Sequence, residues 1–337
     1  MGLIANPAAS KDIRRLVAQG RVVPDWEKVN ILRRVLLGLQ AAGIERVVAM
    51  PDSSRLCQRA RDDSQLSLDL DLLEMSAYYT EGDTIRAAGL MREMGVDCLV
   101  TLGGDGTNRA VARGCSSIPL VAISTGTNNV FPVMVEGTLA GLAAGAIAQG
   151  QLSLEQATVV SKTLDIYVDA EYRDLALVDV AISRERFVAT RAIWDLSTLY
   201  EVFLTRAEPA SIGLSSVGAR LEPVSLIDNG GLRYVLGDYD GEQAGNESAE
   251  GSSSVEVVAP IAPGVVPWVP IAAWARVDMG QRIKLEQRHC TVALDGERAF
   301  TVTPEQQVEI QLQRNGPPVV QVEAALRQAA ELGLFRV

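Results

Sequence analysis

The chain has few of the residues that build metal centres and disulfide frameworks. It contains one histidine and four cysteines in 337 residues. The cysteines form no Cys-x-x-Cys pair, which argues against a zinc site and favours reduced thiols in a cytoplasmic protein. They lie at Cys57, Cys98, Cys115 and Cys290. The one histidine, His289, immediately precedes a predicted strand at 290–294, and we expect it to be structural rather than catalytic.

Long apolar runs and an excess of positive charge are also absent. No apolar run reaches the roughly 18 residues of a membrane helix, and residues 1–7 lack the charged start of a signal peptide. With 31 basic and 42 acidic residues, the net charge is −11. We therefore expect neither a nucleic acid nor a membrane as partner, because both favour a basic surface. The length suggests about two domains.

Glycines are plentiful at two points of the chain. Gly103-Gly104-Asp105-Gly106-Thr107 follows the apolar run 97–102, and Gly126-Thr127-Asn128-Asn129 follows the run 118–123. Such runs predict buried strands, so each loop is expected at the carboxyl end of a strand, where open parallel sheets bind ligands. Glycines allow the backbone to approach a bound group, and successive N–H groups converge on phosphate oxygens.

The first loop matches neither of the two commonest phosphate-binding motifs. No Gly-Lys-Ser/Thr follows it, as in a Walker A loop, and the Gly-x-Gly-x-x-Gly dinucleotide pattern is missing. Asp105 places one carboxylate in the middle of the loop. It either serves a metal ion or a reacting hydroxyl, or is a turn aspartate bonded to its own backbone.

The two parts of the chain have different patterns. Up to residue 150, strands alternate with helices at 26–42 and 84–94, the second with Asp83 as its N-cap, which predicts a doubly wound parallel-sheet α/β domain. From residue 151 to 315, short alternating runs predict an all-β, sandwich-like domain. Residues 238–253 are expected to be a loop and 259–270, with four prolines, an extended connection. The stretch 138–150, made largely of small residues, is predicted to be a packed helix. Residues 316–337 contain a predicted closing helix at 321–333. Expected strands of the second part are 158–161, 163–168, 173–182, 232–236, 254–258, 281–285, 290–294 and 307–313.

Four segments resemble motifs of the superfamily that contains NAD kinases, diacylglycerol kinases and sphingosine kinases. The stretch GGDGTNRAVAR, ending at Arg113, is similar to the NAD kinase phosphate loop, whereas GTNNVF, ending at Phe131, is more similar to the lipid-kinase loop. The opening IANPAAS and the turn Asp295-Gly296-Glu297 resemble two further shared elements. The segments NPAASKDIRRL and AIWDLSTLYEVFLTRAEPASIGLS resemble in particular the acetoin catabolism protein X group of NAD-kinase-like proteins.

This resemblance implies an NAD kinase-like fold and a cytoplasmic, ATP-dependent kinase that uses Mg²⁺ and a small-molecule substrate. It implies a catalytic role for Asp105 and assigns no metal ligands. In the resembling families the C-terminal helix returns to the first domain, and we expect a homo-oligomer. The implied nucleotide-binding residues are Asn6, Pro7, Gly103, Gly104, Gly106, Thr107, Gly126, Thr127, Asn128 and Asn129. The implied substrate-binding residues are Asp179, Asp295, Gly296 and Glu297. We expect both sets of residues to line one cleft.

Two departures from the family patterns leave the phosphoryl acceptor open. Val178 stands where NAD kinases have an asparagine that contacts NAD, and Ala110 stands where lipid kinases usually have an acid. NAD is therefore expected to be a poor acceptor, and a lipid is disfavoured. Two functions remain: a kinase of NAD or another hydroxylated metabolite, and a nucleotide-binding sensor of a catabolic operon with little kinase activity.

Overall fold

The computed structural model describes residues 1–9, 18–20, 22–62, 66–126, 128–185, 195–237 and 255–336. The described residues form two compact units. The N-terminal unit comprises residues 1–9, 22–161 and 315–336, and the C-terminal unit comprises residues 18–20 and 162–314. The expected loop at 238–253 lies outside the described residues. Within the described ranges, no helix has both the length and the apolar character needed to cross a membrane.

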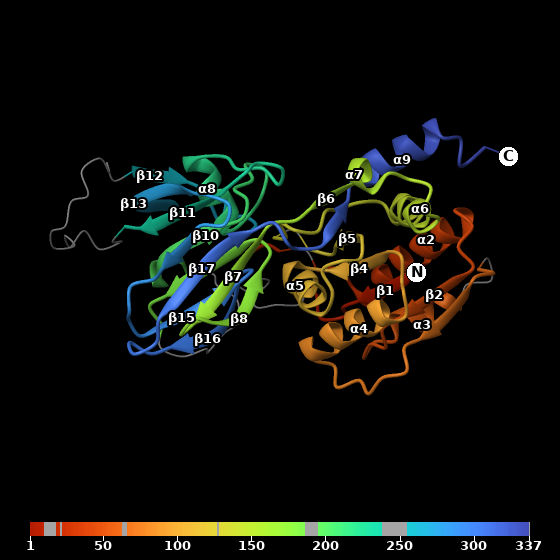
Figure 1. Ribbon diagram of the computed structural model, residues 1–337, viewed down its shortest axis with the longest axis horizontal. Coiled ribbons are helices and arrows are strands. Elements are labelled where there is room, and N and C mark those ends of the chain that lie inside the picture. Colours follow the sequence, from red (N-terminus) through yellow and green to blue (C-terminus); the bar gives the residue numbers. More distant parts are fainter. Residues whose placement is uncertain are drawn as a thin grey trace. The chain divides into compact units, whose positions relative to one another are not determined.

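The N-terminal unit is built on a seven-stranded sheet (Figure 1). Every neighbouring pair is parallel except the last, in which β6 runs antiparallel to β18. In spatial order the strands are β3 (Asp69–Leu72), β2 (Arg46–Ala49), β1 (Gly2–Ala5), β4 (Leu99–Gly103), β5 (Leu120–Ser124), β18 (Pro318–Val320) and β6 (Thr158–Val160). The doubly wound α/β domain predicted from the sequence is thereby confirmed.

Helices cover both faces of this sheet, because the crossover connections alternate between them. One face packs in a core against α2 (Asp25–Ala41), α3 (Leu56–Arg61), α6 (Gly137–Ala148) and α9 (Val322–Glu331). The short α7 (Leu154–Ala157) contacts α9. On the other side, α4 (Glu81–Glu93) packs against α5 (Asp105–Gly114) (Figure 1). Helix α4 starts three residues earlier than predicted, because Thr80 is its N-cap and Asp83 completes a capping box.

Glycines let α2 and α6 approach closely. A Cβ added to Gly141 would lie 2.2 Å from the carbonyl oxygen of Val35, and one added to Gly38 would lie 2.4 Å from that of Thr138. Backbone atoms cannot move aside as a side chain can. The small-residue stretch at 138–150 was predicted to be a packed helix, and α6 confirms this for residues up to Ala148.

The C-terminal unit contains two antiparallel sheets (Figure 1). The larger has the order β12 (Val255–Val258), β13 (Trp268–Val277), β11 (Gly231–Leu236), β10 (Leu199–Leu204), β9 (Asp179–Ser183), β15 (Cys290–Leu294) and β16 (Glu297–Val302). The smaller has β14 (Arg282–Lys284), β17 (Val308–Gln313), β7 (Thr163–Val168) and β8 (Glu171–Ala176). Residues of both sheets share one core, which confirms the sandwich-like prediction.

Two predictions in this unit are wrong in detail. The run 173–182 was predicted as one strand, but it divides into β8 and β9, which belong to different sheets. The division falls at Leu177 and Val178, whose N–H groups bond to the carboxylate of Asp295. The sequence pattern also missed β10, β13, β16 and helix α8 (Leu214–Leu221).

Candidate functional site

The first glycine loop joins β4 to α5. Gly103 ends the strand, and a Cβ added there would lie 2.6 Å from the hydroxyl of Thr107, so the position has no room for a side chain. Gly104 is the N-cap of α5, with an extended φ of −108°. The first N–H groups of a helix have no partners within it and attract anions. The loop therefore presents a helix N-terminus at the carboxyl edge of the sheet.

Asn108 holds this loop to the strand that precedes it. Its fully buried side chain accepts a hydrogen bond from the Thr101 hydroxyl (2.7 Å) and donates one to the carbonyl of Gly104 (2.8 Å). Sequence analysis assigned Asn108 no role. The available signal was a polar residue in the first turns of a helix, on a face that must be buried against the sheet.

The second glycine loop follows β5 and lies against the first. The Ser124 hydroxyl accepts a hydrogen bond from the side-chain amide of Asn129 (2.8 Å) and donates one to the carbonyl of Gly126 (2.8 Å). A Cβ added to Gly104 would lie 2.8 Å from Oδ1 of Asn129, so the two loops are in close contact. Asn128 is half-buried, and Thr127 lies outside the described residues.

Asp105 joins the two loops. Its carboxylate accepts hydrogen bonds from the N–H of Val130 (3.1 Å to each oxygen) and from the N–H of Phe131 (2.8 Å). These amides directly follow the second loop, so the carboxylate of Asp105 bonds to a distant segment and not only to backbone groups of its own turn. Its charge helps to fix the relative position of the two loops.

The Asn6-Pro7 loop follows β1, the strand next to β4. The side-chain amide of Asn6 donates to the Thr107 hydroxyl (2.9 Å), and its Oδ1 accepts from the N–H of Ala8 (2.9 Å). The N–H of Ala9 donates to the carbonyl of Asn6 (3.3 Å). The described N–H groups of this loop are thus bonded within the protein, and the loop reaches α5 through the Asn6 side chain. The helix expected near residue 11 lies outside the described residues.

The basic residues of α5 are directed at α4. Arg109 is almost fully buried and donates to Glu81 (3.0 Å), while Arg113 lies 3.5 Å from the same carboxylate. Glu81 is the first residue of α4, where a negative charge is favoured by the helix dipole. These ion pairs fix the start of α4 beside α5.

The second group of predicted residues lies in the C-terminal unit. Asp179 begins β9, and Asp295 and Gly296 form the turn between β15 and β16, which starts at Glu297. Asp295 and Gly296 have φ values of 51° and 75°, and Leu294 pairs with Glu297. Left-handed conformations at both central residues define a type I′ hairpin, for which Asp-Gly is a preferred sequence. Glu297 is half-buried.

Asp179 and Asp295 are locked to each other through their backbones. The Asp295 carboxylate, on a side chain only 5% exposed, accepts from the N–H groups of Leu177, Val178 and Asp179 at 2.7–3.3 Å. The Asp179 carboxylate accepts from the N–H of Gly296 (3.1 Å). Val178 is fully buried. The geometry gives Asp295 a structural role, since it receives the amides at the point where β9 begins.

The structure therefore brings the predicted residues together in two groups. Asn6, Gly103 to Thr107 and Gly126 to Asn129 belong to the N-terminal unit, with Thr127 undescribed. Asp179 and Asp295 to Glu297 belong to the C-terminal unit. That both groups line one cleft remains a prediction.

Thiol and metal chemistry find no support among the described residues. Burial raises the pKa of the Cys98 thiol to about 12, and it also raises the pKa of the Cys57 and Cys290 thiols. Such thiols are poor nucleophiles, because the thiolate is the reactive form. No group of three or more His, Cys, Asp or Glu side chains within the described ranges could hold a metal ion.

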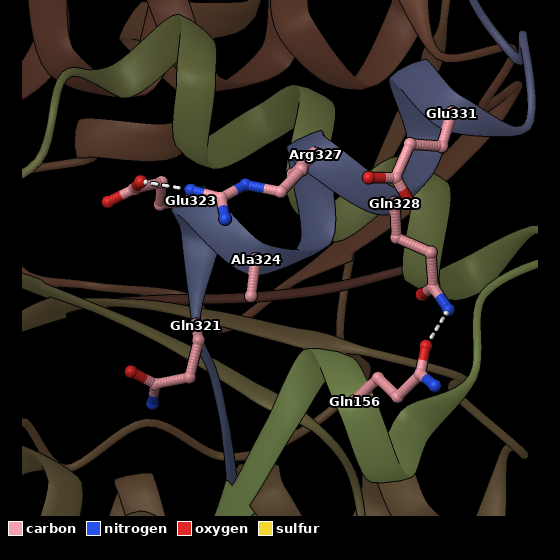
Figure 2. A pocket seen from close by; sticks show the side chains of 7 residues that line it. All are labelled: Gln156, Gln321, Glu323, Ala324, Arg327, Gln328 and Glu331. Carbon is pink, nitrogen blue, oxygen red and sulfur yellow. Dashed lines mark hydrogen bonds and ion pairs between the residues drawn. The ribbon is translucent and has the colours of Figure 1, made fainter.

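A hollow of about 480 Å³ lies at the surface of α7 and α9, away from the glycine loops in sequence (Figure 2). Figure 2 shows a side-chain hydrogen bond from Gln328 to Gln156 (2.9 Å) and an ion pair between Arg327 and Glu323 (2.8 Å). Neither glycine loop contributes a residue to its lining, so it is not the predicted nucleotide site.

Comparison with known proteins places these features in a family. Residues 1–151 match the ATP-NAD kinase N-terminal domain, so the N-terminal unit is of the NAD kinase class. Residues 162–315 match the acetoin catabolism protein X C-terminal domain. The chain is also 39% identical to the acetoin catabolism protein X of Cupriavidus necator over 348 aligned positions, which cover 100% of this chain and 94% of that protein. The chain belongs to the acetoin catabolism protein X family, as the sequence resemblance indicated.

Solved structures with a similar fold include two of a candidate diacylglycerol kinase from Bacillus anthracis strain Sterne. Their TM-scores are 0.47 and 0.46, at 13% and 15% identity. Each alignment covers 95% of this chain and 96% of the other.

Proposed function

We propose that the protein is an ATP-dependent phosphotransferase, which transfers a phosphoryl group to a hydroxyl of NAD or of another small hydroxylated metabolite. The observation that carries the proposal is the junction of two glycine loops at the N-terminus of α5, fixed by the bonds from Val130 and Phe131 to Asp105. The match of residues 1–151 to the ATP-NAD kinase domain supports the same conclusion.

The first loop is proposed to receive the nucleotide phosphates. Gly103, Gly104 and Gly106 lie at the start of α5, where N–H groups and the helix dipole favour anions. Asn6 and Pro7 would support the loop through Thr107. The second loop, Gly126 to Asn129, would contact the nucleotide from the adjoining strand end.

The first loop offers one carboxylate that could hold Mg²⁺. Mg²⁺ in kinases is held largely by substrate phosphates and water, with one or two carboxylates from the protein. Asp105 is the carboxylate within the loop, and its two amide donors leave it in a fixed position. When bound, the metal would neutralise phosphate charge.

Phosphoryl transfer needs alignment and charge neutralisation more than covalent chemistry. Asp105 is proposed to accept the proton of the attacking hydroxyl or to hold that hydroxyl in line. Asp179, Asp295, Gly296 and Glu297 are proposed to contact the acceptor, with Asp295 holding Asp179 in place. Val178 offers no side-chain hydrogen bond, so NAD is proposed to be a poorer acceptor here than in typical NAD kinases.

Calorimetric titration with ATP tests the binding step. The wild type should bind, and Gly104→Val should not, because its Cβ would lie 2.8 Å from Oδ1 of Asn129 and separate the loops. Gly89→Ala is a matched control in α4, since the nearest atom to its added Cβ is 3.8 Å away. Equal affinity of wild type and Gly104→Val would contradict the loop as the phosphate site.

Transfer is then tested with NAD first and other hydroxylated metabolites after it, with product identified by mass spectrometry. Formation of a phosphorylated acceptor supports the kinase. Efficient NADP formation would contradict the interpretation of Val178.

The alternative function, a nucleotide-binding sensor without efficient transfer, is favoured by a different observation. Both carboxylates central to the proposal, Asp105 and Asp295, are engaged by backbone amides, as structural groups are. ATP binding with no product from any acceptor, together with a ligand-dependent change in hydrogen exchange, would support the sensor.

A further inference from the structure

A buried lysine on α2 contacts the Asn6-Pro7 loop. Lys28 is fully buried, and its ammonium donates to the carbonyls of Pro7 (2.7 Å), Ala9 (2.8 Å) and Asn6 (3.4 Å). The loop thus turns three of its carbonyls toward one cation.

Packing alone does not explain a lysine at this position. Burying a charge is costly unless it is well bonded, and a methionine would fill a similar volume without that cost. The residue also lies in the first turns of α2, where a positive charge opposes the helix dipole. Asp25 and Glu27 in the first turn partly offset this effect.

The residue type fits the geometry of the loop. The 31 basic residues comprise 27 arginines and 4 lysines, so lysine is uncommon in this chain. An ammonium has three donors arranged around one point and can serve three carbonyls, whereas the planar guanidinium is built for bidentate partners. An arginine is therefore not equivalent here.

The loop that Lys28 holds is connected to the phosphate-loop helix. Asn6 lies in it and donates to the hydroxyl of Thr107, the third residue of α5 (2.9 Å). A continuous set of contacts thus runs from the Lys28 ammonium through the loop carbonyls and the Asn6 side chain to the start of α5.

We propose that Lys28 is a positioning residue for nucleotide binding, which holds the Asn6 loop so that Asn6 fixes Thr107 at the start of α5. This inference rests on the proposed function, because the bound group is the nucleotide whose phosphates α5 receives. Lys28 itself touches neither nucleotide nor acceptor.

A double-mutant cycle in ATP affinity tests the route. Lys28→Met keeps the length of the side chain and removes the donors, while Asn6→Ala removes the bond to Thr107. Each single variant should weaken ATP binding at least about tenfold, and the double variant should be no weaker than the worse single variant by more than about twofold. Lys28→Arg should fail to restore affinity. Lys284→Met, which removes an exposed lysine, is the control.

The outcomes separate this inference from the proposed function. If the wild type binds no ATP, the proposed function fails and this inference with it. If the wild type binds and Lys28→Met binds equally well, only the role of Lys28 is overturned. Losses that multiply in the double variant would overturn the route through Asn6, since independent effects add in free energy. If Lys28→Met does not fold, Lys28→Gln, which keeps an amide donor, takes its place in the cycle.

Discussion

Asp105→Asn is the most informative substitution, because the carboxylate has both a structural and a proposed catalytic role. One oxygen accepts from both Val130 and Phe131, and the other accepts from Val130 alone. In asparagine, one oxygen is retained and the other becomes an NH₂ donor, which would face the N–H of Val130 at about the same separation. A hydrogen bond to a charged group contributes about 1.5–3 kcal/mol. We expect the free energy of unfolding to fall by about that amount.

Urea unfolding measures the structural role of Asp105. ATP calorimetry and a phosphoryl-transfer assay on the same samples measure its proposed role in the site. Because the carboxylate positions the second loop, ATP affinity should fall by about tenfold, equivalent to about 1.4 kcal/mol. Phosphoryl transfer should fall by at least about a hundredfold beyond that, the lower end for general acid–base catalysis.

An exposed carboxylate provides the control. Asp62→Asn removes a charge at the end of α3 and should change neither the free energy of unfolding nor ATP affinity nor phosphoryl transfer. A free energy of unfolding for Asp105→Asn within about 0.5 kcal/mol of the wild type would refute the structural role. Undiminished transfer would refute the catalytic role.

Three further substitutions test the fold around the sites. Gly141→Ala should lower the free energy of unfolding by about 1–3 kcal/mol, because its Cβ would meet a backbone oxygen at 2.2 Å. The control Gly89→Ala should be neutral or stabilising. A Gly141→Ala variant as stable as the wild type in urea unfolding would contradict the close contact between the helices. Asp295→Ala should destabilise the protein more than Asp295→Asn, because alanine leaves several buried amides without an acceptor and is strained at a φ of 51°. Equal urea unfolding midpoints of the two variants would argue against a structural role for the side chain. Burial, with the neighbouring Arg314 cation, lowers the pKa of Lys162 to about 8, so the unfolded chain holds this proton more tightly. The free-energy cost of burying the charged lysine is present below pH 8 and is lost as the pH rises toward 10.5. The free energy of unfolding of the wild type should therefore rise relative to that of Lys162→Met between pH 8 and 10.5. Parallel profiles of unfolding free energy against pH for the two proteins would contradict this.

Local patterns in the sequence were sufficient for the class of the fold. Apolar runs ending in glycines predicted β4 and β5 and placed both loops at one sheet edge, because parallel strands share that edge. The Asp295-Gly296 dipeptide predicted a hairpin turn, since few residues adopt two successive left-handed conformations. The small residues at 138–150 predicted a packed helix, which is α6.

Only the tertiary structure decided which groups meet. The run 173–182 looked like one strand by its alternation, but the carboxylate of Asp295 takes the amides of Leu177 and Val178 and divides it into β8 and β9. Strand β13 forms although the segment before it is rich in proline, because β11 and β12 pair with it on both sides. Asp105 and Lys28 acquire their roles from partners 19 to 26 residues away in sequence. Turn chemistry and periodicity act over a few residues and can be read from the chain, whereas the partner of a buried charge depends on which segments the fold brings together.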